Sequence, residues 1–254
     1  MTIRKTFAID YNFQLKNLVV SGCSFTSNTS EDCAVSWPYY LRDLGGFDKV
    51  ISTALPGAGN YHIAKSLQWT IETQQPDPDN SLIIVMWSGN DRDDIIVNSE
   101  FIKKDYLKKE SAASKFDFSE NVGSGITGGI SGESNLNLHF FKDLNYIKSK
   151  KSRAIENYLI ISSLWQYLMS HNYKFLFLNY LDLSLPNRTL DFDITEYLPQ
   201  SLINKYRSFF SNVPNIYSWC LEKDLLWHDD FHPSPDGHLH WTRNALIPSL
   251  KSIL

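Results

Sequence analysis

The sequence has little that would tie the protein to a membrane or to a nucleic acid. No window approaches the ~18 consecutive apolar residues that a membrane-spanning helix needs. The basic N-terminus is not followed by the uninterrupted apolar core of a secretory signal. The formal net charge of -4 gives no general attraction to nucleic acid or to anionic lipid. We therefore expect a cytoplasmic protein without nucleic-acid or membrane partners, and assembly into a larger particle stays open.

Cysteine is also scarce, which argues against two further classes of protein. Cys23, Cys33 and Cys220 cannot all pair within one chain, and they lack CxxC spacing. The sequence thus indicates neither a disulfide framework nor a zinc knuckle. What the chain does have is a globular composition, with 43% hydrophobic and 20% charged residues. Its 254 residues fit one large α/β domain, and its aromatic share of 14% could line a carbohydrate-binding or apolar cleft.

A strand–turn–helix pattern is repeated through most of the chain. Apolar runs predict strands at residues 18–20, 50–54, 82–87 and 174–180, and a short fifth strand at 216–219. Helical spacing of apolar residues predicts helices at 37–44, 61–73, 152–173 and 238–254. In the helix at 152–173, the apolar period includes Ile155, Leu159 and Met169. The alternation of strands and helices favours a parallel sheet that is covered by helices on both sides.

The pattern fails between residues 98 and 151, where lysines, a glycine-rich stretch and scattered aromatics are mixed. A structureless loop of this length is uncommon inside a compact domain. We therefore predict a single domain over residues 1–254, with an insertion at about 98–151 that contains some helix. Because the insertion leaves from the carboxyl end of the third strand, it is either a lid that contacts substrate or a variable surface loop.

The first strand ends in a turn that presents a serine. The apolar run at residues 18–20 breaks at Gly22 into small and polar residues, which is typical of a tight turn at the end of a parallel strand. In open α/β sheets, ligands bind at the carboxyl ends of the strands. Ser24 therefore stands where a nucleophile would be presented, although an ordinary turn serine would look the same.

A polar cluster before the last helix contains the partners that a serine nucleophile needs. A serine hydroxyl is a poor nucleophile unless a base lies within hydrogen-bond reach, and histidine suits that role because its pKa is near neutrality. A carboxylate on the other ring nitrogen fixes the tautomer and stabilises the imidazolium. Asp229 and His232 are separated by two residues, so one turn could bring both of them to Ser24.

Four short blocks of the sequence together resemble the SGNH/GDSL hydrolases. They are SGCSFT at 21–26, PGAGN at 56–60, SGND at 88–91 and DDFHP at 229–233, in the family's order and with its spacing. The resemblance implies a three-layer α/β/α sandwich with a central, mostly parallel five-stranded sheet, as in flavodoxin-like folds. It also implies a serine esterase mechanism with a Ser-His-Asp triad, without a metal and without an organic cofactor.

Carried over by position, the resemblance assigns roles to five residues. Ser24 would be the nucleophile, His232 its general base and Asp229 the carboxylate that orients the histidine. The oxyanion hole would consist of the backbone N–H groups of Ser24 and Gly57 and the side-chain amide of Asn90. The residue types suit these roles, since glycine allows a close backbone approach and an asparagine amide is a neutral donor.

Two positions depart from the family pattern, because Cys23 stands where an aspartate is usual and Ser88 where a glycine is usual. Neither change removes a catalytic group. Three alternatives stay open at this point: Cys23 as the nucleophile, Gly59 in place of Gly57 as the backbone donor, and a metal site near the C-terminus. The metal site would draw on His228, Asp229, Asp230, His232, His238 and His240, which lack a recognised ligand spacing.

The predicted function is the hydrolysis of an acyl ester, with an acetyl ester on carbohydrate as the expected small-molecule or glycan substrate. That substrate rests on the family and on the aromatic content, although Trp37, Trp87 and Trp241 are more typical of a core. Two alternatives keep the same fold. One is a catalytically silent carbohydrate-binding or structural particle protein, and the other is an O-acyltransferase in which an alcohol takes the place of water.

Overall fold

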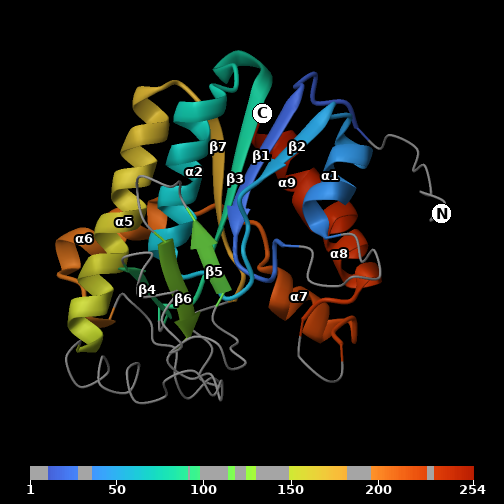
Figure 1. The fold of residues 1–254 in the computed structure, drawn as a ribbon. Coiled ribbons are helices and arrows are strands. Elements are labelled where there is room, and N and C mark those ends of the chain that lie inside the picture. Colours follow the sequence, from blue (N-terminus) through green and yellow to red (C-terminus); the bar gives the residue numbers. More distant parts are fainter. Residues whose placement is uncertain are drawn as a thin grey trace.

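A computed structural model of the chain describes residues 11–27, 36–90, 92–97, 114–117, 124–129, 149–181, 196–227 and 232–254 (Figure 1). Its centre is a parallel sheet of four strands: β1 (Asn17–Gly22), β2 (Lys49–Ser52), β3 (Ser81–Trp87) and β7 (Lys174–Asn179). The strands lie in the order β2-β1-β3-β7, and every neighbouring pair is parallel. Four of the predicted strands are thereby confirmed.

The strand β3 is the centre of the core. It has a parallel partner on each side, and all seven of its residues are buried. A strand that is covered on both faces cannot alternate polar and apolar side chains, which explains its unbroken apolar run. Trp87, at its end, packs edge-on against Phe177 of β7 with 5.2 Å between ring centroids. Trp37, Trp87 and Trp241 are all at most 1% exposed, as expected for core residues.

Helices cover both faces of the sheet and give it three layers (Figure 1). On one face, α2 (Asn60–Gln74) lies beside α5 (Lys150–Ser170). The other face carries α1 (Trp37–Gly45), α8 (Pro235–Trp241), the π-helical stretch η4 (Thr242–Leu246) and α9 (Ile247–Ile253). A further helix, α6 (Gln200–Ser208), precedes the C-terminal group. The predicted three-layer α/β/α arrangement is confirmed, and no helix in the described ranges is long and apolar enough to cross a membrane.

The predicted fifth strand is wrong, because residues 216–219 belong to the helix α7 (Ile216–Glu222). The side chain of Asn215 caps this helix and accepts a hydrogen bond of 2.8 Å from the backbone N–H of Ser218. Ile216 and Cys220 are both fully buried and lie four residues apart, which places them on one helical face. The short apolar run therefore fits helical spacing, and the parallel sheet has four strands in the part of the chain that the structure describes.

Of the predicted insertion at 98–151, the structure describes two strands and the start of α5. The strands β5 (Ser114–Asp117) and β6 (Ser124–Gly129) join β4 (Arg92–Val97) in an antiparallel sheet of order β4-β6-β5. The other residues between 98 and 148 lie outside the described ranges, and with them the predicted helix of the insertion. The two described strands of this segment therefore extend a small second sheet that starts with β4, between β3 and the segment itself.

Candidate active site

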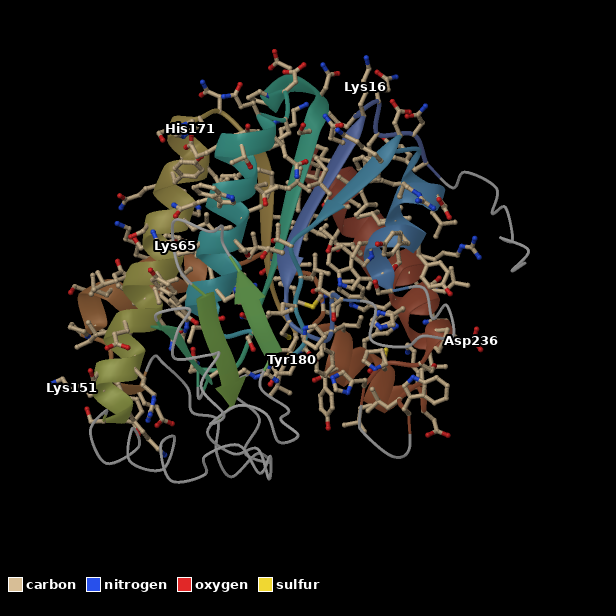
Figure 2. The ribbon with its side chains drawn as sticks, in the orientation of Figure 1. Lys16, Lys65, Lys151, His171, Tyr180 and Asp236 are labelled. Carbon is tan, nitrogen blue, oxygen red and sulfur yellow. The ribbon has the colours of Figure 1, made fainter. Side chains whose placement is uncertain are left out.

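The carboxyl ends of the parallel strands all lie at the same end of the sheet. Figure 2 marks the two ends of the sheet, with Lys16 just before β1 at one end and Tyr180 just after β7 at the other. Ser24 follows β1, Gly57 follows β2 and Asn90 follows β3. Because β2, β1 and β3 are neighbours in the sheet, these three turns are adjacent at the same edge.

The turn after β1 is a tight helical turn that glycine makes possible. The carbonyl of Cys23 accepts hydrogen bonds from the backbone N–H groups of Thr26 (2.9 Å) and Ser27 (3.0 Å). A Cβ on Gly22 would overlap the Thr26 hydroxyl and lie 3.0 Å from the carbonyl oxygen of Met86, so only glycine fits there. Ser24 is partly exposed at the front of this turn, whereas Cys23 is fully buried. The alternative of Cys23 as nucleophile is therefore disfavoured, because its thiol lies in the core.

His232 is held by a short antiparallel pairing between residues 225–227 and residues 232–234. The backbone N–H of Trp227 donates to the carbonyl of His232 (2.7 Å), and Leu226 forms a β-bridge with Pro233. The N–H of Ser234 then donates to the carbonyl of Leu225 (2.9 Å). This pairing fixes the backbone of His232 just before α8 begins.

The hydroxyl of Ser24 and the imidazole of His232 form a hydrogen bond. The Oγ atom of Ser24 lies 2.7 Å from Nε2 of His232, although the two residues are 208 positions apart in the sequence. The ring of Phe25 packs against the imidazole with 4.7 Å between centroids, and against Tyr180 with 4.6 Å. A neutral imidazole whose Nε2 faces a hydroxyl can accept its proton. Asp229 lies outside the described residues.

The turn between β2 and α2 contains two glycines, Gly57 and Gly59, that could supply a backbone N–H to the oxyanion hole. The N–H of Gly59 donates to Oδ1 of Asp94 (2.8 Å), and the N–H of His62 donates to Oδ2 of the same carboxylate (2.7 Å). Asp94 of β4 thus caps the start of α2 from outside the helix. Gly59 is committed to this cap, which disfavours it as an oxyanion donor. Gly57 has a left-handed φ of 79°, a conformation that favours glycine.

Asn90 is 1% exposed and lies in a turn that two other asparagines hold in place. Asn60, the first residue of α2, accepts a hydrogen bond from the backbone N–H of Ser88 (2.9 Å). Asn157 of α5 donates from Nδ2 to the carbonyl of Asn90 (3.5 Å). Neither Asn60 nor Asn157 is predicted as a site residue from the sequence. A polar residue at the start of a helix after a glycine-rich turn was the available signal for Asn60.

A buried histidine, His238, lies near the candidate base His232. His238 of α8 is 7% exposed, and burial lowers its pKa to about 3, with positive charge on His232 as a further cause. Burial likewise lowers the pKa of His62 in α2 to about 4. Above these values both side chains are neutral. His240, the next histidine, accepts a hydrogen bond on Nδ1 from the indole of Trp219 (3.0 Å).

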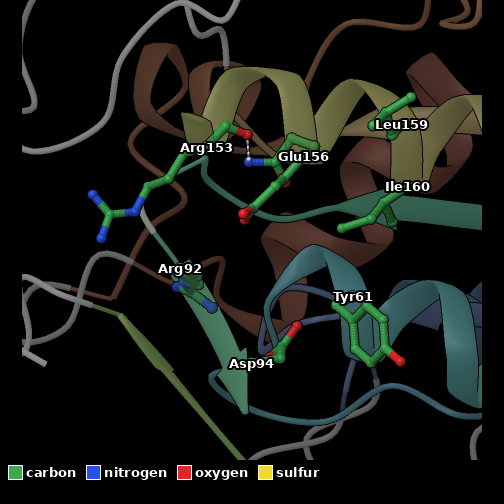
Figure 3. Close-up of a pocket in the computed structure, with 8 residues that line it drawn as sticks. Tyr61, Arg92, Asp94, Arg153, Glu156, Leu159 and Ile160 are labelled. Atoms are coloured by element: carbon green, nitrogen blue, oxygen red, sulfur yellow. Dashed lines mark hydrogen bonds between the residues drawn. The ribbon is translucent and has the colours of Figure 1, made fainter. Parts of the chain in front are cut away.

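A cavity of about 290 Å³ has residues of α5 on one side and residues of α2 and β4 on the other (Figure 3). Its lining consists of Tyr61, Arg92, Asp94, Arg153, Glu156, Asn157, Leu159 and Ile160. Neither Ser24 nor His232 is among these lining residues. Within the ranges that the structure describes, no three His, Cys, Asp or Glu side chains are grouped so that they could hold a metal ion.

Two solved structures with this fold align with the chain over almost their whole length. The chain resembles TesA with 15% identity and a TM-score of 0.52, over 94% of this chain and 100% of TesA. It resembles the psychrotrophic esterase EstA from Pseudoalteromonas sp. with 10% identity and a TM-score of 0.51, over 94% of this chain and 98% of EstA. Comparison with family models and with curated proteins gives no match. The structural similarity confirms the fold expected from the SGNH/GDSL resemblance.

The neutral His238 predicts how stability depends on pH. An unfolded histidine has a pKa of about 6.5, so the unfolded chain binds more protons than the folded chain between that value and the lowered pKa. The free energy of unfolding should therefore fall as the pH is lowered from about 6.5 towards about 3. His238→Gln should make the free energy of unfolding less dependent on pH in this range, by the contribution of one bound proton. The measurement is urea unfolding of both proteins at a series of pH values. Parallel stability profiles for the variant and the wild type would contradict the assignment.

Proposed function

We propose that the chain is a serine ester hydrolase of the SGNH/GDSL type, with Ser24 as nucleophile and His232 as general base. The observation that carries this proposal is the 2.7 Å contact between Ser24 Oγ and His232 Nε2. It joins a turn after the first strand to a loop before the last helices, at the edge of the sheet where ligands bind in open α/β folds. A nucleophile and a base within hydrogen-bond reach are the minimum that acyl transfer requires.

In the acylation step, Ser24 Oγ attacks the carbonyl carbon of the ester while its proton moves to Nε2 of His232. The carbonyl oxygen becomes an oxyanion, and the tetrahedral intermediate then expels the alcohol. His232 returns the proton to the leaving alkoxide, so that the alcohol departs neutral and the acyl group stays on Ser24. In the second half, His232 takes a proton from water as the water oxygen attacks the acyl carbonyl carbon. The tetrahedral intermediate then breaks its bond to Ser24 Oγ, which regains the proton from His232 as the acid is released.

The oxyanion needs hydrogen-bond donors that are already in position when the charge develops. We assign this role to the backbone N–H groups of Ser24 and Gly57 and to the side-chain amide of Asn90. Support comes from the adjacency of the three turns at one edge of the sheet and from the burial of Asn90. Loss of one such donor typically costs about 2.7–4 kcal/mol of transition-state stabilisation, because a fixed dipole in a site shielded from water needs no reorganisation.

The two structural neighbours share the fold of this chain at identities of 15% and 10%. EstA is named as an esterase, and its structure is described as inhibited by monoethylphosphonate. A phosphonate that reacts with an activated serine is therefore a suitable probe for Ser24. A shared fold does not by itself imply a shared activity. The contact between Ser24 and His232 is therefore the stronger support for a hydrolase.

An acetyl ester on carbohydrate is the substrate that we propose. The overall aromatic content gives little support, since Trp37, Trp87 and Trp241 are buried. Better support comes from Trp227, whose side chain is 51% exposed and whose backbone N–H holds the carbonyl of His232. An exposed indole at the rim of a site offers an apolar face against which a sugar ring can stack.

Hydrolysis of p-nitrophenyl acetate should depend on Ser24. We expect Ser24→Ala to lower kcat by ~10³-fold or more, because no other group replaces the nucleophile, and to abolish labelling by a fluorophosphonate probe. Ser27→Ala is the matched control, since Ser27 lies in the same turn and should leave kcat and labelling intact. An active Ser24→Ala protein would exclude Ser24 as nucleophile, and a wild type with neither activity nor labelling would favour a silent binding or structural protein. An acylated sugar as main product would indicate the transferase instead.

Asp229 and Asp230 provide a matched pair for the third member of the triad. Asp229→Asn should lower kcat by ~10²–10⁴-fold, because an amide does not fix the histidine tautomer or stabilise the imidazolium. Asp230→Asn makes the same change of charge one residue further on and should leave kcat unchanged. The measurement is steady-state hydrolysis of p-nitrophenyl acetate by the two variants. Equal losses in both, or a loss in Asp230→Asn alone, would reject Asp229.

The role of Trp227 can be separated from catalysis by comparing two substrates. Trp227→Ala should raise KM for an acetylated oligosaccharide ~2–10-fold, the usual worth of one aromatic contact, and leave the KM for p-nitrophenyl acetate unchanged. Trp69→Ala is the control, because Trp69 is 44% exposed on α2, outside the turns of the site. If KM rises equally for both substrates, or if no acetylated glycan is hydrolysed, the carbohydrate assignment fails.

A further inference from the structure

The turn that carries Asn90 is held by the side chain of Asn60 rather than by a neighbouring strand. Oδ1 of Asn60 accepts a hydrogen bond from the backbone N–H of Ser88 (2.9 Å), and its Nδ2 donates to the carbonyl of Ser88 (3.4 Å). One amide therefore binds both backbone groups of the same residue, as a partner strand would. This contact lies just past Trp87, where the pairing of β3 with β7 ends.

Asn157 extends this contact to the far side of the turn. Its Oδ1 accepts a hydrogen bond from Nδ2 of Asn60 (2.8 Å). Its Nδ2 donates to the carbonyl of Arg153 (3.0 Å, dashed line in Figure 3) and to the carbonyl of Asn90 (3.5 Å). The backbone is thus held at Ser88 and again at Asn90. Fixing the backbone on both sides of the intervening residue limits the directions in which the Asn90 side chain can point.

All three amides are withdrawn from water. Asn60 is 1% exposed, Asn157 is 6% exposed and Asn90 is 1% exposed. Buried polar groups are costly unless they are hydrogen-bonded, so the geometry of such a network is well defined. Asn60 and Asn157 are uncharged, and each side-chain amide offers both a hydrogen-bond donor and an acceptor. An apolar side chain at either position could make none of these hydrogen bonds.

Asn60 also belongs to the segment that contains the second proposed donor. It is the first residue of α2 and follows the turn with Gly57. The start of α2 is itself fixed by Asp94, which accepts the N–H groups of Gly59 (2.8 Å) and His62 (2.7 Å). A rigid helix start therefore connects the Gly57 turn, through the Asn60 side chain, to the Asn90 turn.

We propose that Asn60 and Asn157 are positioning residues that hold one oxyanion donor, the Asn90 amide, at the correct distance from the other, the Gly57 N–H. This inference rests on the proposed function, since it concerns the donors assigned there. The two asparagines act through Asn90 and make no contact with the reacting atoms. Small displacements of a donor are enough to matter, because a shift of about 1 Å can cost ~10²-fold in rate.

The test is a double-mutant cycle between Asn60 and Asn90, measured on p-nitrophenyl acetate at a temperature where every variant is folded. Asn90→Ala should lower kcat by ~10²–10³-fold, and Asn60→Ala by ~10–10²-fold, both with KM little changed. If Asn60 acts through Asn90, then Asn60→Ala should cost little further activity once Asn90 is already alanine. A purely structural role for Asn60 would lower kcat by the same factor in both backgrounds, and that result would overturn the inference.

The chain contains a matched control at the opposite end of the same strand. Asn17 donates from Nδ2 to the hydroxyl of Ser81 (3.1 Å), the first residue of β3. Asn17→Ala also removes an asparagine side chain bonded to β3, and it should leave kcat unchanged. A loss of kcat in Asn17→Ala as large as that in Asn60→Ala would overturn a specific role for Asn60.

Two further variants keep the cycle informative if Asn60→Ala does not fold. Asn60→Asp has the same shape and can still accept from Ser88, but it loses the amide donor that bonds Asn157. Asn157→Ala removes the bond to Asn90 from the other side. Both should lower kcat in the wild-type background and have little effect with Asn90→Ala. A wild type that neither hydrolyses the ester nor reacts with a fluorophosphonate overturns the proposed function and this inference together. An active wild type with additive losses overturns this inference alone.

Discussion

The parallel pairing of β1 with β3 is the constraint on which the rest of the site depends. Their register runs without a break from Asn17 opposite Ser81 to Gly22 opposite Met86. Because both strands end at the same level, the turns with Ser24 and Asn90 leave the sheet side by side. β2 is paired in the same sense on the other side of β1 and adds the turn with Gly57. A shift of one residue in this register would move each side chain of β3 to the opposite face of the sheet. It would also separate the turn with Ser24 from the turn with Asn90.

The turns at that edge are fixed by polar contacts between segments that are distant in the sequence. Asp94 caps α2 from a different sheet, Asn60 replaces a missing strand partner at Ser88, and a β-bridge holds the loop with His232. Such contacts suit a site that is built on loops, because they keep the backbone rigid where no regular secondary structure does so. The side chains of these loops can then face a ligand. The apolar core sets the position of the strands, and these polar groups set the direction of the turns.

Much of the fold, but less of the supporting network, could be predicted from the sequence. The strands and the turn with Ser24 follow from local apolar runs and from glycine, and those signals lie within a few residues of each other. The strand predicted at 216–219 is part of the helix α7, because a four-residue stretch with three apolar residues fits either period. In α5, Ile155, Leu159 and Met169 form an apolar row, yet they are 39%, 55% and 50% exposed. The buried face lies one residue away and includes Asn157, whose role depends on partners 67 and 97 positions distant.

The distribution of charge around the candidate base follows from burial. Two protonated histidines close together would repel each other, and His238 lies near enough to His232 for that charge to lower its pKa. Complete desolvation is the larger cause, and it keeps His238 neutral at every pH above about 3. The oxyanion donors that we propose are amides, which do not titrate at all. In the mechanism that we propose, a proton taken from Ser24 moves to His232, because these two side chains share the hydrogen bond of 2.7 Å and the neighbouring His238 stays neutral.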